Sequence, residues 1–107
     1  MEYFIDHNEL PKRELFPGIS ATIVHSEQIT ASRVSLDKGA ILPEHSHPNE
    51  QWTHIISGEL ELKVGGETRI LTPGMTAFIP SNVPHSGKAS VACEVIDIFN
   101  PARTDLK

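Results

Sequence analysis

The chain has 107 residues, the usual length of one domain, and we expect a single domain over residues 1–107. Nine Lys and Arg against 14 Asp and Glu give a net charge of −5, which disfavours binding to the phosphate backbone of nucleic acids. With one cysteine, no membrane-length apolar run and a polar, acidic start, the sequence excludes an intramolecular disulfide and predicts a cytoplasmic protein without membrane partners.

Alternation of polar and apolar residues, which is typical of half-buried strands, dominates the chain. The clearest example is residues 59–64, which Gly65-Gly66 separates from a partner strand as in a hairpin. The predicted strands cover residues 18–25, 28–36, 51–57, 59–64, 67–71, 75–79 and 90–99. Residues 8–15 have some helical spacing, but Pro11 lies among them. Short strands with frequent turns predict an all-β sandwich or small barrel.

The pair His45-x-His47 is the most informative pattern among six histidines. In an extended segment residues i and i+2 face the same way, so both imidazoles can reach one metal ion. Gln51 or Glu50 could add an oxygen ligand, and His85 follows a turn-rich segment that could return it to the same site. Such a set suits Zn, Fe, Mn, Ni or Co. The alternative is a pair of solvated loop histidines.

The spacing around these histidines resembles the two motifs of the cupin superfamily, G-x5-H-x-H-x3,4-E-x6-G and G-x5-P-x-G-x2-H-x3-N. The resemblance covers residues 34 to 99. It implies a small jelly-roll β-barrel, often dimeric, with one divalent transition metal in its mouth. The matching residues are Gly39, His45, His47, Gln51 and Gly58 in the first motif, and Gly74, Pro80 and His85 in the second.

The chain departs from the cupin pattern at three positions. Gln51 stands in place of glutamate, Asn82 in place of a glycine and Ala89 in place of the terminal asparagine. Asn tolerates the left-handed backbone better than most residues, so the second change is mild. The neutral Gln51 leaves the ion its full charge, which favours a Lewis-acid role over tuning iron for oxygen chemistry.

Asp97 and Phe99 lie at positions i and i+2 at the end of the last predicted strand, and Arg103 follows at i+6. In an extended chain all three would face the same side. An acid among apolar neighbours costs free energy unless it is paired. Asp97 is therefore either a partner of Arg103 that pins the C-terminal tail, or an acid/base group aimed into the barrel. In the second case Arg103 would grip a substrate carboxylate.

The tail from Asp97 to Arg103, together with His45-Ser46-His47-Pro48 and Glu50-Gln51, is similar to that of the pectin-degradation cupins. These proteins convert 4,5-unsaturated uronates into linear ketouronates. The resemblance implies a metal-dependent sugar-acid isomerase with catalytic Asp97 and Arg103, with Phe99 and Arg103 contacting a small anionic substrate. A non-catalytic metal-containing binding or sensing module and an iron-dependent dioxygenase are the alternatives.

The N-terminal segment carries Tyr3, Phe4 and Ile5, which a short free tail does not need. We expect them to dock on a sheet, either of the same chain or of the partner chain in a two-fold homodimer. Trp52 and His54 share the strand face opposite Gln51, so we expect them in packing or in the dimer seam.

Overall fold

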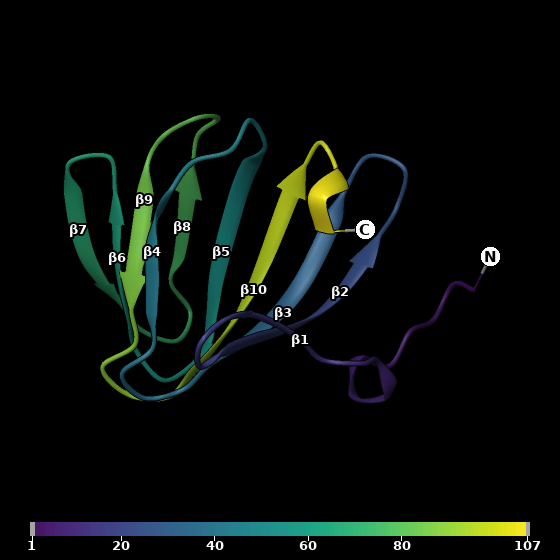
Figure 1. The fold of residues 1–107 in the computed structure, drawn as a ribbon, viewed down its shortest axis with the longest axis horizontal. Helices are drawn as coiled ribbons and strands as arrows, with labels where there is room; N and C mark the ends of the chain where they lie inside the picture. Colours follow the sequence, from purple (N-terminus) through teal and green to yellow (C-terminus); the bar gives the residue numbers. More distant parts are fainter. Residues whose placement is uncertain (1, 107) are drawn as a thin grey trace.

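The computed structural model describes residues 2–106, and in this part of the chain ten strands form two antiparallel sheets (Figure 1). The strands are β1 (Arg13–Phe16), β2 (Ile19–His25), β3 (Thr30–Leu36), β4 (Ile41–His45), β5 (Glu50–Ser57), β6 (Leu60–Val64), β7 (Glu67–Leu71), β8 (Thr76–Ile79), β9 (His85–Lys88) and β10 (Cys93–Asn100). One sheet has the order β1-β2-β3-β10-β5-β8 and the other β4-β9-β6-β7. The expected all-β fold is confirmed.

The helical elements of the described residues are two three-residue 3-10 turns, η1 (His7–Glu9) and η2 (Thr104–Leu106). The turn η2 follows β10 and lies beside β3, close to the C-terminus (Figure 1). Within residues 2–106 there is no helix of the length and apolar character that a membrane crossing requires.

Every segment predicted as a strand contains one, but three further strands escaped the alternation analysis. These are β1, β4 and β9, which are short and rich in polar residues, and β4 contains Pro43. The last strand also begins later than predicted, at Cys93, which leaves Val91, a residue of the predicted range 90–99, outside the strand. Val91 lies in the bend before the strand and is 43% exposed.

The core lies between the two sheets, and along β3 and β5 every second residue points into it. On β10 the inward-facing Val95 is in register with Val34 of β3 and Ile55 of β5. Two residues further along, the inward position is Asp97, and its partner on β5 is Thr53. The same inward face therefore changes from apolar to polar along its strands, and the polar end holds the candidate site.

Two turn positions explain why the motif favours glycine. Gly58 has φ +76°, and a Cβ there would collide with the backbone of Ala92 and with Cys93, where β5 closes against the start of β10. Asn82 adopts φ +63°, also in the left-handed region. An asparagine in that conformation agrees with the tolerance expected from the sequence.

Candidate metal centre

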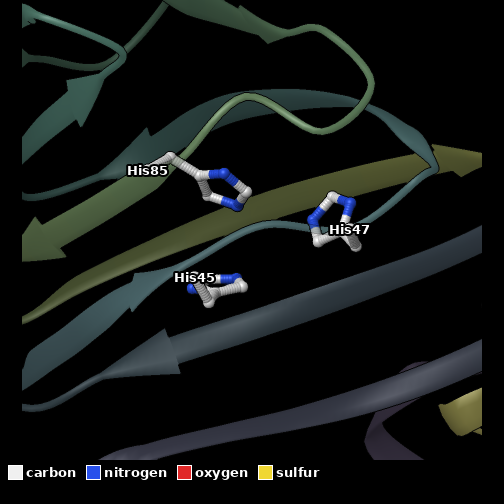
Figure 2. Close-up of side chains that lie close together, drawn as sticks. All are labelled: His45, His47 and His85. Carbon is white, nitrogen blue, oxygen red and sulfur yellow. The ribbon is translucent and has the colours of Figure 1, made fainter.

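Three histidines, two from one motif and one from the other, converge at the polar end of the inward face (Figure 2). His45 ends β4 and is in register with His85 at the start of β9, while His47 lies in the connection to β5. One nitrogen from each of the three lies within 4.8 Å of the others. The prediction that these histidines meet is confirmed, and the cluster could bind a metal ion.

Hydrogen bonds between two loops hold the cluster together. The Asn82 amide donates to the His47 carbonyl at 2.8 Å, and the Ser81 hydroxyl donates to the Pro48 carbonyl at 2.6 Å. These bonds join the loop that carries His47 to the turn-rich segment before His85. The left-handed backbone at Asn82 thus lies at the point where the two motifs meet.

Each of the three imidazoles has its Nδ1 atom 2.9 to 3.0 Å from a backbone carbonyl two residues away. A carbonyl only accepts hydrogen bonds, so Nδ1 carries the proton and Nε2 keeps its lone pair in the neutral ring. The three pairs are His45 with Pro43, His47 with Asn49, and His85 with Val83.

The free nitrogens have the chemistry of cation ligands. Nε2 of His85 is buried without a hydrogen-bond partner in the described part of the chain. Nε2 of His47 lies 3.0 Å from Oε1 of Gln51, so two acceptors face each other. Desolvation lowers the pKa of His47 and lowers that of His85 to about 4, so both rings are neutral at pH 7. These residues fit a divalent metal ion.

The neighbours of Gln51 on β5 point away from the cluster. Glu50 is exposed, as are Trp52 and His54, whereas Gln51 is 6% exposed. Trp52 stacks against Phe78 on the outer face, with ring centroids 4.7 Å apart. The strand alternation therefore places Gln51 inside and Glu50 outside.

Asp97 is connected to the histidines by a chain of side-chain contacts. The Thr53 hydroxyl donates to Oδ1 of Asp97 at 2.7 Å and accepts from Nε2 of Gln51 at 2.9 Å. Oε1 of the same Gln51 faces His47. Sequence reasoning missed Thr53, although its position two residues after Gln51 on an alternating strand was a signal for it.

The Asp97 carboxyl group lines a cavity of about 320 Å³, together with His45, His85 and Phe99. Burial raises the pKa of Asp97 to about 6. The hydrogen bond from Thr53, the nearby Gln51 amide and the charge of Arg103 oppose this rise. A carboxyl group with such a pKa can exchange a proton near neutral pH.

Arg103 also lines the cavity, and its guanidinium carbon lies 4.9 Å from the centroid of the Phe99 ring. The alternative in which Arg103 pairs with Asp97 is wrong. Its ion pair is with Asp105, Nη2 to Oδ2 at 2.7 Å, because that carboxylate follows two residues later on the same turn. Asp97 therefore stands in the cavity without an ion-pair partner among the described residues.

Asn49 and Thr30 hold the segment that follows β10. The Asn49 side chain donates to the Pro101 carbonyl at 2.6 Å, and the Thr30 hydroxyl accepts from the Arg103 amide at 2.8 Å. Neither contact was predicted from the sequence, since each joins residues more than 50 positions apart. These two hydrogen bonds fix the position of the Arg103 backbone beside the cavity.

Comparison with known proteins agrees with this geometry. The family described as "Cupin domain" matches residues 32–99. The pectin degradation protein KdgF of Dickeya dadantii is 36% identical over 107 residues, 96% of each chain. The solved structure of KdgF from Halomonas sp. covers all of both chains with 30% identity and a TM-score of 0.93.

A second solved structure, an RmlC-like cupin from Shewanella frigidimarina, has 27% identity and a TM-score of 0.94, and the match covers 100% of this chain and 97% of that one. The histidine cluster of the two motifs lies inside the segment that matches the family. This chain therefore belongs to the cupin domain family and resembles the KdgF proteins of pectin degradation along its length.

Proposed function

We propose that this protein is a metal-dependent isomerase that opens the ring of an unsaturated uronate to give a linear ketouronate. The observation that carries the proposal is Asp97, which lines the same cavity as His45 and His85 of the cluster and has a pKa raised to about 6. The similarity to KdgF of Dickeya dadantii supports pectin degradation as the setting and a sugar acid as the substrate.

His45, His47, His85 and Gln51 are the proposed ligands of one divalent ion, Zn, Fe, Mn, Ni or Co. None of the four carries a negative charge: three are imidazoles, of which His47 and His85 have their pKa values lowered by burial, and Gln51 is an amide. The ion would act as a Lewis acid that polarises a substrate oxygen. Its ligands add no negative charge that would weaken this effect.

Asp97 is the proposed proton-transfer group. Its carboxylate would take the proton from the hydroxyl group on the hemiacetal carbon of the substrate, and that carbon becomes an aldehyde. The bond from this carbon to the ring oxygen breaks, and its electron pair stays on the oxygen as an enolate. A proton is then added to the far carbon of the former double bond. One proton has been removed and one added, so the linear product is an isomer of the substrate. Thr53 holds Asp97 in place through its 2.7 Å hydrogen bond.

Arg103 and Phe99 are the proposed substrate contacts. A planar guanidinium matches the two oxygens of the uronate carboxylate, and the Phe99 ring offers an apolar wall for the sugar. The guanidinium carbon of Arg103 lies 4.9 Å from the centroid of the Phe99 ring, which supports contacts of both residues with the same part of a substrate. This division gives Arg103 a role in binding and Asp97 a role in the chemical step.

The experiment begins with metal analysis of protein purified without added ions, followed by a panel of unsaturated uronates. We expect turnover, and we expect Arg103→Ala to raise KM about tenfold or more, because a charge-assisted pair is lost. Arg69→Ala, on the exposed strand β7, is the control. A wild type that binds uronates without converting them would favour a binding or sensing module, and oxygen consumption would favour a dioxygenase.

We also propose that the protein is a homodimer. Tyr3 and Phe4 are 84% and 92% exposed on an N-terminal segment that extends away from the sheets (Figure 1). Trp52 and Phe78 leave an apolar area on the outer face of the six-stranded sheet. Both surfaces would be covered by a second copy. Light scattering at tens of micromolar should give about twice 11.8 kDa, and the monomer mass would contradict the dimer.

A further inference from the structure

Arg103 is held along one edge of its guanidinium group. Nε donates to Oδ1 of Asp105 at 2.9 Å and Nη2 donates to Oδ2 at 2.7 Å. A guanidinium has five N–H groups, so the two on Nη1 and one on Nη2 remain. Within residues 2–106 no protein group accepts a hydrogen bond from Nη1. The Nη1–Nη2 edge of the Arg103 guanidinium is thus available to a ligand.

Asp105 lies on a turn that other strands hold in place. The carbonyl of Leu106 accepts from Nη1 of Arg13 at 2.9 Å and contacts Nε2 of His25 at 3.3 Å. At the other end of the turn, the Arg103 amide donates to Thr30, which is fully buried. Because β1, β2 and β3 all hold this segment, the Asp105 carboxylate has a fixed position relative to the cavity.

Exposure separates the roles of the two charged groups. The Asp105 side chain is 61% exposed, whereas that of Arg103 is 14% exposed and lies against the Phe99 ring. The Arg103 hydrogen bonds also hold the pKa of Asp105 below its usual range, so Asp105 is ionised at neutral pH. Both residues line the cavity, and the more exposed Asp105 carboxylate holds the Nε–Nη2 edge of the more buried guanidinium.

We propose that Asp105 is a positioning residue that holds the Nε–Nη2 edge of Arg103, so that the Nη1–Nη2 edge is presented to a substrate carboxylate. The proposal rests on the function given above, in which Arg103 binds that carboxylate. Two parallel hydrogen bonds from a fixed fork select a carboxylate by shape as well as by charge. A competing idea, in which Asp105 occupies the substrate's place and must be displaced, predicts the opposite effect of removing its charge.

The test compares the metal-loaded wild type with Asp105→Asn and Asp105→Glu. We expect Asp105→Asn to raise KM by about 3- to 10-fold with kcat little changed, since the pair is partly exposed. Asp105→Glu should restore part of the affinity. Glu59→Gln, an exposed site on the turn between β5 and β6, removes the same charge and should change nothing. In an Arg103→Ala background Asp105→Asn should have no further effect. A fall in KM, or an equal effect of Glu59→Gln, would overturn the proposal.

A binding measurement separates this proposal from the enzymatic one. Titration calorimetry with D-galacturonate, a saturated uronate, reports carboxylate binding without turnover, and the Arg103 Nε–Hε NMR signal reports its order. We expect weaker binding and faster hydrogen exchange of this signal in Asp105→Asn. Equal affinity in the wild type and Asp105→Asn would overturn the positioning role even in an active enzyme. Binding that depends on both residues, without any turnover, would support it and overturn the enzymatic function.

Discussion

The two ends of the inward face of β3, β5 and β10 have the same backbone pattern and opposite chemistry. At one end Leu36, Ile55 and Val95 are buried among apolar neighbours. At the other end the same alternation turns Thr53 and Asp97 inward, where they meet the histidine cluster. Strand alternation decides which side chains point into the barrel, and the residue type along the strand decides whether they stabilise the fold or bind a ligand.

The polar end costs free energy that the apolar end offsets. Burial raises the pKa of Asp97 to about 6, so the ionised form is disfavoured there, and Nε2 of His85 is buried without a partner. The hydrogen bond from Thr53 to Asp97 offsets part of this cost. Sites with such local conflicts are where function is expected in an otherwise consistent fold.

The largest effect should follow from removing a proposed metal ligand at the polar end. His85→Ala removes one of three converging imidazoles. Loss of an outer partner of a ligand already costs roughly 10- to 100-fold in metal affinity, so loss of the ligand should cost at least that much. Metal content after dialysis measures this effect, with exposed His54→Ala as the control. Full metal content in His85→Ala would contradict the proposed ligand set.

A substitution at the apolar end should change stability and leave the metal centre intact. Ile55 is 0% exposed, and Ile55→Ala should lower the free energy of unfolding by about 2–5 kcal/mol through lost contacts and a cavity. Denaturant unfolding measures this change. Metal content per folded chain should match the wild type. A change below about 1 kcal/mol would show that the two ends do not divide the roles as described.

A smaller effect of opposite sign is expected when the charge at the polar end is removed. The pKa of Asp97 is raised from 3.8 to about 6, so the stability contributed by its proton is present at low pH and lost as pH rises through about 6. In metal-free protein, Asp97→Asn should therefore raise the free energy of unfolding by about 1–3 kcal/mol near pH 8.

The pH dependence provides the check on that interpretation. Near pH 4 Asp97 is already protonated, so the gain from Asp97→Asn should disappear. Unfolding curves of both proteins at the two pH values, with metal removed by a chelator, measure the difference. A gain of equal size at both values would show that the effect does not come from the charge.

Local patterns revealed much of the fold and the cluster, because alternation and motif spacing are short-range signals. The hairpin at 59–71 and the pairing of His45 with His47 follow from neighbours in the sequence. The strands β1, β4 and β9 did not show this signal, since they are short and polar.

Contacts between distant segments could not be predicted from the sequence. The hydrogen bond from Thr53 to Asp97 spans 44 positions, and the pairing of Arg103 with Asp105 rather than Asp97 depends on how Thr30 and Arg13 hold the tail. Strand register and tail placement are set by tertiary packing. Sequence alone therefore left open whether Arg103 pairs with Asp97 or binds a substrate carboxylate, and it did not predict the pair with Asp105.

The most direct test of the account is the turnover of an unsaturated uronate by the wild type and by Asp97→Asn at equal metal content. Positioned acid/base catalysis contributes about 10²–10⁴-fold, so Asp97→Asn should lose that factor in kcat while it keeps its metal and its fold. Equal rates for the two proteins would show that Asp97 is a structural residue of the cavity and would contradict the proposed chemistry.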